Sequence, residues 1–316
     1  MAVGFDLLVL AELNPDVVVA CDDEVRFGQV EQLVDRATIT LGSSGAITAS
    51  AAAAQGLRVA LCGVVGDDAV ATMTVDLLAA QGVDVSGVVR RSGSATGMTI
   101  VLTRTGGDRA LLTFPGTMSE LRTADLDLEV VASARHVHVS SLFLQRALQP
   151  DLGALFSSAR AGGATTSIDP GWDPREQWTE VLALLPDVDV FLPNAAECAQ
   201  IAAATGRAGG DPARVLHELG PSVAVKLGAE GARLVSAEGA WRVSIDPVEP
   251  VDTTGAGDNF DAGFLAGLLD GAAPAQALAR GVASGTFAVG GWGGTGRLAT
   301  REEALELAGA LIVEQS

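Results

Sequence analysis

One stretch decides how the rest of the chain is interpreted: Val251-Asp252-Thr253-Thr254-Gly255-Ala256-Gly257-Asp258-Asn259-Phe260-Asp261-Ala262-Gly263-Phe264. Gly255 and Gly257 permit backbone angles that a side chain would forbid, so successive amide groups can point at one spot and form an anion cradle. Phe260 and Phe264 lie one helical turn apart, which predicts that a helix with one buried face begins inside the stretch. The positive end of that helix would face the cradle.

Asp258 lies inside this predicted cradle, where a second negative charge would repel a bound anion. The position suits a general base. Asp258 could accept the proton of a substrate hydroxyl, while the amides of Ala256, Gly257 and Asp258 stabilise charge on a transferring phosphoryl group. Alternatively, Asp258 and Asp261 only decorate the first turn of a helix, as acidic residues often do. A short glycine motif alone does not decide between the two hypotheses.

The segment 252–258 closely resembles the C-terminal signature of the ribokinase-like (PfkB) carbohydrate kinases. This resemblance implies that Asp258 is the catalytic base and that the turn of Gly255, Ala256 and Gly257 is the anion hole. It also implies a ribokinase-like α/β fold, ATP as the phosphoryl donor and Mg²⁺ as the cofactor.

The composition limits the class of protein. The 316 residues carry a formal net charge of −19 and include a single lysine, Lys226, so such a surface would repel nucleic acid and anionic membranes. The three cysteines are odd in number and far apart, which suggests neither a disulfide framework nor a zinc site and fits a reducing cytosol. Asp6 and Glu12 interrupt the first apolar run, so we expect neither a signal peptide nor a membrane span.

Apolar runs of strand length alternate with helical patterns along most of the chain. This spacing predicts one α/β domain, residues 1–316, with a mostly parallel central sheet covered by helices on both faces. Two regions, 17–41 and 98–114, instead alternate apolar and polar side chains, which is typical of antiparallel hairpin strands. We assign these two regions to a small β lid on the α/β body. The strands of the body are expected at 7–10, 59–62, 137–139, 166–168, 188–192 and 223–227.

Asn14 and Asp16 follow the first predicted strand, and residues two apart in an extended chain point the same way. Pro15 biases Asn14 toward that extended geometry, and open α/β sheets bind ligands beyond the carboxyl ends of their strands. A turn with an Asx residue would explain the same sequence. The family resemblance implies the functional role, in which both side chains hold sugar hydroxyls.

The run Gly42-Ser43-Ser44-Gly45-Ala46-Ile47 looks like the N-terminal signature of the same family, with two departures. The second glycine of the usual pair is Ser43, and the usual asparagine, a sugar contact, is Ile47. The resemblance therefore implies an acceptor site that includes Gly42, Ser43 and Ile47, with an apolar side chain where relatives place an amide. Alanine propensity alone would also explain a helix over residues 46–55.

Asn194 and Glu197 have the spacing of a capping box at the start of a helix, which is a sufficient structural explanation. In the family that this chain resembles, an Asn-x-x-Glu after a strand at this point organises Mg²⁺ through its waters, and hard oxygen ligands suit that ion. The two roles can coexist. The resemblance also implies that Asp252 and Thr254 correspond to positions that hold K⁺ in some relatives.

Residues 225–231, Val-Lys-Leu-Gly-Ala-Glu-Gly, resemble the strand and turn beside the nucleotide in this family. The resemblance implies that Lys226, Gly228 and Gly231 contribute to the ATP site, together with Gly293 near the C-terminal end of the chain. A buried strand explains the apolar members of the segment but not its glycines.

Taken with the resemblance, these patterns imply an ATP- and Mg²⁺-dependent kinase of a sugar or sugar-like alcohol that forms a homodimer through its lid. The alternatives are a nucleoside kinase of the same superfamily and a ligand-binding homologue that has lost catalysis. The departures at Ile47 and at Asp173, where relatives often carry an arginine, permit the second alternative. A dinucleotide oxidoreductase is disfavoured, since no Gly-x-Gly-x-x-Gly follows the first strand.

His136 and His138 share one face of a strand, but two histidines alone seldom suffice for a metal, so a packed strand is expected.

Overall fold

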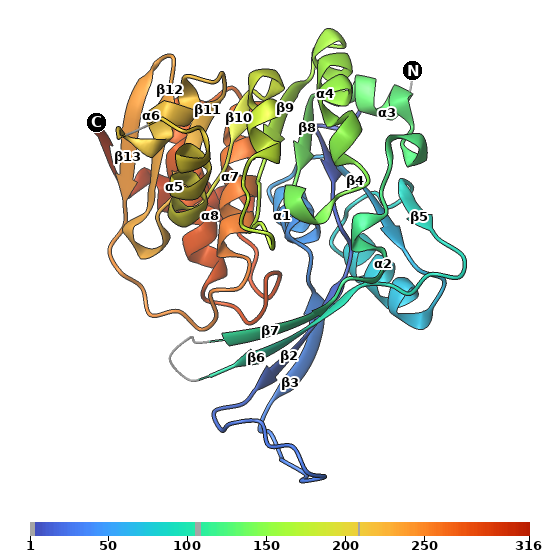
Figure 1. Cartoon of the computed structure of the whole chain (residues 1–316). Helices are drawn as coiled ribbons and strands as arrows, with labels where there is room; N and C mark the ends of the chain where they lie inside the picture. Colours follow the sequence, from blue (N-terminus) through green and yellow to red (C-terminus); the bar gives the residue numbers. More distant parts are fainter. Residues whose placement is uncertain (1–3, 105–108, 208) are drawn as a thin grey trace.

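The computed structural model describes residues 4–104, 109–207 and 209–316. Its main body is a ten-stranded sheet that helices cover on both faces (Figure 1). From one edge to the other, the strands are β14 (Ile312–Gln315), β13 (Gly239–Ser244), β12 (Ala232–Ser236), β11 (Ser222–Lys226), β10 (Val190–Phe191), β9 (Thr165–Ile168), β8 (His136–Val139), β1 (Leu7–Leu10), β4 (Val59–Val65) and β5 (Val88–Arg90). The pairs from β11 to β5 are parallel, so the prediction of a mostly parallel sheet is confirmed.

An antiparallel edge formed by β12, β13 and β14 extends this sheet beyond β11, and the sequence pattern does not predict it. The reason lies in the connections. A single turn of 3₁₀ helix, Gly228–Glu230, joins β11 to β12, and an equally short turn joins β12 to β13. Parallel neighbours need a crossover of a dozen or more residues, so these short turns allow only antiparallel pairing of β11 with β12 and of β12 with β13. The long segment with α7, α8 and α9 leads to β14, which pairs antiparallel with β13.

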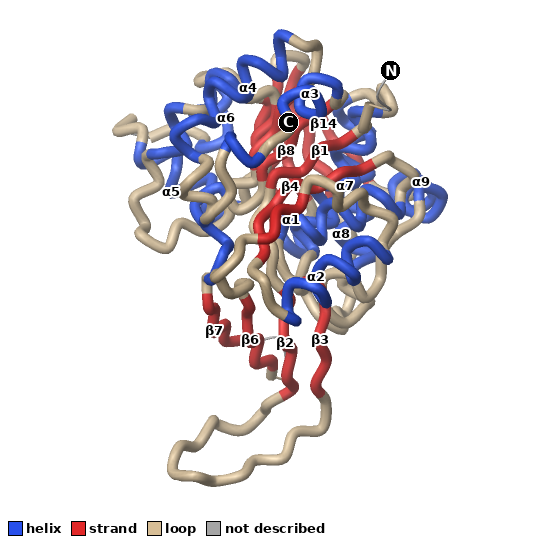
Figure 2. The backbone as a smooth tube through the Cα atoms, turned by 90° about the vertical axis from the view of Figure 1, so that its right-hand side faces the viewer, coloured by secondary structure: helices blue, strands red, loops and turns tan. Residues whose placement is uncertain are grey.

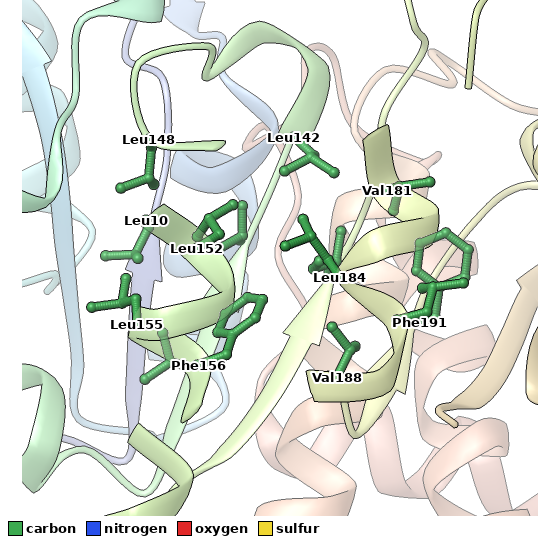
Figure 3. Packing of buried hydrophobic residues seen from close by; sticks show 14 of the residues in the cluster. Leu10, Leu142, Leu148, Leu152, Leu155, Phe156, Val181, Leu184, Val188 and Phe191 are labelled. Carbon is green, nitrogen blue, oxygen red and sulfur yellow. The ribbon is translucent and has the colours of Figure 1, made fainter. Parts of the chain in front are cut away.

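Alternate residues of β1 feed two separate cores on opposite faces of the sheet. Leu8 and Leu10 belong to one core, and Leu7 and Val9 belong to the other, which explains why the strand is apolar throughout. Figure 3 shows part of the first core, including Leu10 of β1 and Leu152 of a covering helix. The first core is covered by α3 (Leu128–Ser133), α4 (Leu152–Ala161), α5 (Ala195–Ala204) and α6 (Pro212–His217), and the second by α1 (Ser44–Ala54), α2 (Ala69–Ala80), α7 (Ala256–Leu269), α8 (Pro274–Ala288) and α9 (Arg301–Gly309) (Figure 2).

A second, four-stranded sheet projects from the body (Figures 1 and 2). Its strands, in order, are β3 (Ala37–Leu41), β2 (Pro15–Ala20), β6 (Met98–Thr103) and β7 (Arg109–Phe114). The predicted small sheet is confirmed, with two differences. The central pair, β2 with β6, is parallel, because both strands leave the body in the same direction. Residues 21–36, inside the first predicted region, form a long excursion without a strand.

Within the described ranges, none of the helices combines the length and the apolar character that a bilayer span requires.

Candidate active site

The glycine turn of residues 255–257 opens helix α7. Gly255 caps the helix with a φ of 73°, in the left-handed region that favours glycine, and a Cβ atom at this position would lie 2.6 Å from the Cα of Gly294. The Ala256 amide donates a long hydrogen bond of 3.3 Å to the Thr253 carbonyl. An α-helix leaves the amides of its first turn without an internal acceptor. The amides of Gly257 and Asp258 are therefore the better placed donors for an anion.

Asp258 lies in this first turn, and α1 holds it from the other side. Ser44 Oγ donates a hydrogen bond to Asp258 Oδ1, and Thr48 Oγ1 donates to the Asp258 carbonyl at 3.3 Å. Burial raises the pKa of the Asp258 carboxyl to about 6, and the negative charge of Asp169 adds to the rise. A carboxylate with a pKa close to neutrality is suited to accept a proton and to release it again.

Lys226, the last residue of β11, sends its side chain into a cluster of carboxylates beside this turn. Its Nζ lies 2.9 Å from Asp169 Oδ2 and 3.1 Å from Asp261 Oδ2, and Asp261 is fully buried. Burial raises the pKa of Asp261 well above its usual range. Burial opposes ionisation of Asp169 most strongly, but the Lys226 charge together with hydrogen bonds from Asp261, Lys226 and the Gly171 amide lowers its pKa overall. Of the two carboxyls, Asp169 therefore ionises more readily, and Asp261 holds a proton more strongly.

The residues expected to bind the acceptor come together beyond the end of β1. Asn14 Nδ2 donates a hydrogen bond of 3.0 Å to Asp16 Oδ1, and both side chains are buried. Gly42 lies against them: a Cβ atom there would lie 2.1 Å from Asp16 Oδ1. Burial raises the pKa of Asp16 to about 7, and the charge of Asp258 contributes. Asn14, Asp16 and Gly42 therefore form one buried polar cluster, and Asp16 lies close enough to Asp258 for the two charges to interact.

Ser43, also expected in the acceptor site, uses its hydroxyl within the protein. It is the N-cap of α1 with a φ of 63°, and its Oγ accepts from the Ala46 amide and donates to the Glu12 carbonyl. The next residue, Ser44, donates its amide to Glu12 Oε1 at 3.1 Å. Burial raises the pKa of Glu12 to about 8. Ser43 thus shapes the start of α1, whereas Ser44 and Glu12 lie near Asp258, where the sequence does not predict them.

Ile47 is buried where α1 meets the glycine turns. A Cβ atom on Gly294 would lie 2.3 Å from Ile47 Cδ1, and one on Gly255 would lie 3.1 Å from Ile47 Cγ2. The Ile47 side chain therefore occupies the space that a residue other than glycine at position 294 would need. Ser44 and Ile47 are three residues apart on α1, so both face the start of α7.

Asn194 and Glu197 form the predicted capping box at the start of α5. The Glu197 amide donates to Asn194 Oδ1 at 2.9 Å, and the Asn194 amide donates to Glu197 Oε2 at 2.8 Å. The Lys226 amide donates to the Pro193 carbonyl at 3.0 Å, which places this cap beside the carboxylate cluster. Burial raises the pKa of Glu197 to about 7, with a contribution from Asp169. The capping box uses one carboxylate oxygen, and Oε1 can accept a further hydrogen bond.

The glycines of the predicted nucleotide turn have the conformations that such a turn requires. Gly228 and Gly231 have φ values of 61° and 89°. A Cβ atom on Gly231 would lie 2.0 Å from the Val243 carbonyl oxygen, so the hairpin of β12 and β13 excludes any side chain there.

Asp252 ties the loop before α7 to the loop that contains Gly293. Its Oδ2 accepts from the Gly293 amide at 2.8 Å, and its Oδ1 accepts from the Thr254 hydroxyl at 2.8 Å. Thr254 Oγ1 also accepts a hydrogen bond of 3.1 Å from Arg109, the first residue of strand β7. Arg109 thus bridges the small sheet to the active-site loop. The sequence carries no signal for this contact, because residues 109 and 254 meet only in the folded protein.

A model of the pfkB family carbohydrate kinases matches residues 5–301. The chain belongs to the PfkB family of carbohydrate kinases. It is 27% identical to the ribokinase of Haemophilus influenzae, over 95% of this chain and 97% of the relative. It is 30% identical to the 2-dehydro-3-deoxygluconokinase of Bacillus subtilis, over 84% and 86%. A ribokinase II structure from E. coli with ATP and Mg²⁺ has the same fold, with a TM-score of 0.84 at 22% identity over 97% and 99% of the two chains.

This PfkB kinase is therefore an ATP-dependent enzyme that phosphorylates a hydroxyl of a sugar or sugar-like molecule. Two other sequence features have structural roles in it. His136 and His138 are buried and both share hydrogen bonds with Ser167 Oγ, at 2.6 and 2.7 Å, so the expected packed strand is confirmed. Asp173 is buried and accepts the Trp178 amide at 3.0 Å. The Asp173 carboxylate thus holds the loop between residues 173 and 178 in place.

Proposed function

We propose that this PfkB kinase transfers the γ-phosphoryl group of ATP to a sugar hydroxyl with Asp258 as the general base. The observation that supports this role most strongly is the placement of Asp258 between the hydroxyl of Ser44 and the first-turn amides of α7. The acceptor oxygen attacks the γ-phosphorus while its proton passes to Asp258, and ADP leaves with the electrons of the broken phosphorus–oxygen bond. The amides of Gly257 and Asp258, and to a smaller extent Ala256, stabilise the charge on the transferring group.

Asn14, Asp16 and Gly42 form the acceptor side of the proposed site. Asn14 and Asp16 place a buried amide beside a buried carboxyl, which suits a ligand that both donates and accepts hydrogen bonds, as vicinal sugar hydroxyls do. Ser43 contributes by holding the start of α1 in place. Ile47 supplies an apolar wall, which favours an acceptor that presents a deoxy carbon on that side.

On the nucleotide side, we propose that Lys226, Gly228, Gly231 and Gly293 border the ATP phosphates and adenine. The left-handed glycines allow close approach of the backbone to a ligand. For K⁺, Asp252 and Thr254 remain a prediction of the resemblance. Both carboxylate oxygens of Asp252 already accept protein hydrogen bonds, so backbone carbonyls would have to supply most ligands of that ion.

Asn194 and Glu197 are the residues that would hold Mg²⁺, through its water ligands. The donor set fits, because the carboxylate oxygens are hard ligands and Glu197 lies next to other acidic groups that attract a divalent cation. When bound, Mg²⁺ neutralises charge on the ATP phosphates. The part of this chain is to orient the hydrated ion by means of Glu197, whose position the capping box fixes.

Replacing Glu197 by glutamine should raise the Mg²⁺ concentration that half-saturates the enzyme, while the acceptor KM changes little. Glutamine still completes the capping box but loses the charge. Mg²⁺ titrations of the initial rate, at saturating ATP and acceptor, measure this effect. If both constants stay at wild-type values, Glu197 acts only as a helix cap. A circular dichroism melt of the variant checks that the cap survives.

The small sheet carries a row of apolar side chains on one face, which supports a homodimer formed through the lid. Ile39, Val17, Ile100 and Leu112 are direct cross-strand neighbours on all four strands. Leu112 is 58% exposed and Ile39 is 50% exposed, which is unusual for a lid that only covers its own site. We propose that residues 17–41 and 98–114 act as the lid of a single domain and that two lids pair through this row.

Replacing Leu112 by glutamate should convert the dimer into a monomer at micromolar concentration. Two unpaired carboxylates would be buried in each interface, at an expected penalty of several kcal/mol per ion. Light scattering coupled to gel filtration measures the mass. Leu305→Glu is the matched control, because Leu305 is 49% exposed on α9 in the body and should leave the dimer intact. A wild-type protein that is monomeric would contradict the proposal.

A panel of sugars and nucleosides, with ADP formation as the readout, tests the proposed acceptor class. Phosphorylation of nucleosides in preference to sugars would favour the nucleoside kinase alternative. Binding of a sugar without turnover would favour the ligand-binding homologue.

We also propose a cytoplasmic location, since Cys21, Cys62 and Cys198 are free thiols, as a reducing compartment would keep them.

A further inference from the structure

The only lysine of the chain ends in the carboxylate cluster beside the proposed base. Lys226 is a β11 residue whose side chain is 12% exposed and bonds both Asp169 and Asp261. Carboxylate oxygens of Asp169, Asp258 and Asp261 lie within 4.8 Å of one another. A Cβ atom on Gly257 would lie 3.6 Å from Lys226 Nζ, so the ammonium lies beside the first turn of α7. The positive charge of Lys226 therefore lies beside the proposed base and is bonded to the two other carboxylates of the cluster.

We propose that Lys226 is a positioning residue for phosphoryl transfer: held by Asp169 and Asp261, its charge keeps Asp258 ionised and able to accept the acceptor proton. This inference rests on the proposed role of Asp258. With one proton between Asp169 and Asp261, the cluster that they form with Lys226 is neutral as a whole. Without the Lys226 charge the cluster would be negative beside Asp258 and would oppose its ionisation.

Other charged groups also face Asp258 from several elements. Asp16 at the start of β2, Glu12 after β1 and Glu197 on α5 each interact with it electrostatically, and their charge opposes its ionisation. Arg109 of β7 favours its ionisation, as Lys226 does. Lys226 differs from Arg109 in being anchored by two buried carboxylates rather than carried by the small sheet.

The test compares charge changes of opposite sign within the cluster. The measurement is the dependence of kcat/KM on pH, whose acid limb is the range in which the rate rises as the base ionises. In Lys226→Met, Asp169 and Asp261 share one proton and keep one negative charge, so the midpoint of the acid limb should move up by about one pH unit. Lys226→Arg keeps the positive charge and should retain the wild-type limb. In the double variant Asp169→Asn, Asp261→Asn the lysine charge is uncompensated, so the limb should move down by about one pH unit.

The single variants Asp169→Asn and Asp261→Asn provide the matched controls. When one carboxyl is removed, the other can carry the negative charge, so each single variant should keep the limb within about 0.3 pH unit of wild type. If the substitutions only disturbed the packing of the cluster, they would not shift the midpoint of the acid limb in opposite directions in Lys226→Met and in the double variant. If these two shift the limb in the same direction, or neither shifts it, the proposal is wrong.

A second measurement does not depend on turnover. Aspartate labelled with ¹³C in its carboxyl group reports the titration of Asp258 by NMR in the free protein, with Asp258→Asn to assign the signal. The Asp258 midpoint should move with the same signs as the kinetic limb. If the sugar panel finds no acceptor, the proposed function fails, but the NMR titration still tests the role of Lys226. If Lys226→Met does not fold, the comparison uses the double variant, in which the Asp258 midpoint should move down, and Lys226→Arg, in which it should stay at the wild-type value.

Discussion

Replacing Asp258 by asparagine is expected to lower kcat by about 10²–10⁴, the usual contribution of a general base, while ATP binding stays largely intact. Asparagine has the same shape, and its carbonyl oxygen can still accept the hydrogen bond from Ser44 Oγ, so α1 and α7 should remain joined. What the variant loses is the ability to take a proton from the acceptor. Single-turnover kinetics measure the chemical step, and calorimetry measures ATP binding separately.

The control for this substitution is Asp76→Asn, the same chemical change at an exposed position on α2. It should keep the wild-type rate. A loss of less than tenfold in Asp258→Asn would show that the carboxylate is not the base. A simultaneous loss of ATP affinity would point instead to a structural role of Asp258 at the start of α7.

The part of the site that the sequence predicts well is the part built from short segments. The glycine turn at Gly255, the helix after it and the capping box of Asn194 and Glu197 each follow from backbone preferences of a few neighbouring residues. The pair Asn14 and Asp16 is of the same kind, since extended geometry alone brings the two side chains to one face.

The contacts that could not be predicted join segments far apart in the chain. Lys226 was expected beside the nucleotide from its place in a strand and turn, but the direction of its long side chain depends on Asp169 and Asp261, which lie in two other segments. Arg109 reaches Thr254 across 145 positions of the sequence. Such pairings are fixed by tertiary packing, which neither periodicity nor composition encodes.

The same distinction applies to the fold. Apolar runs predict the parallel strands, because a strand buried on both faces must be apolar at every position. They do not tell which strands pair, so the parallel contact of β2 with β6 and the antiparallel edge of β12 to β14 emerge only from the structure. For β11 to β13 the short connecting turns, rather than the pattern within the strands, decide the pairing.

A second large effect is expected in the choice of acceptor sugar, and it depends on the side chain of Ile47. A sugar hydroxyl buried against isoleucine without another partner costs about 1–3 kcal/mol. This corresponds to roughly a tenfold to hundredfold handicap for ribose relative to an acceptor that lacks that hydroxyl. Ribose should accordingly be a poor substrate of the unmodified enzyme.

Replacing Ile47 by asparagine should improve kcat/KM for the hydroxylated sugar and lower it for the preferred acceptor, because the amide supplies the missing hydrogen bond. Ile47→Val is the control, since it shortens the side chain without adding a polar group and should not improve ribose. Efficient phosphorylation of ribose by the wild-type enzyme would contradict the prediction and would mean that Ser44 or a bound water partners the hydroxyl.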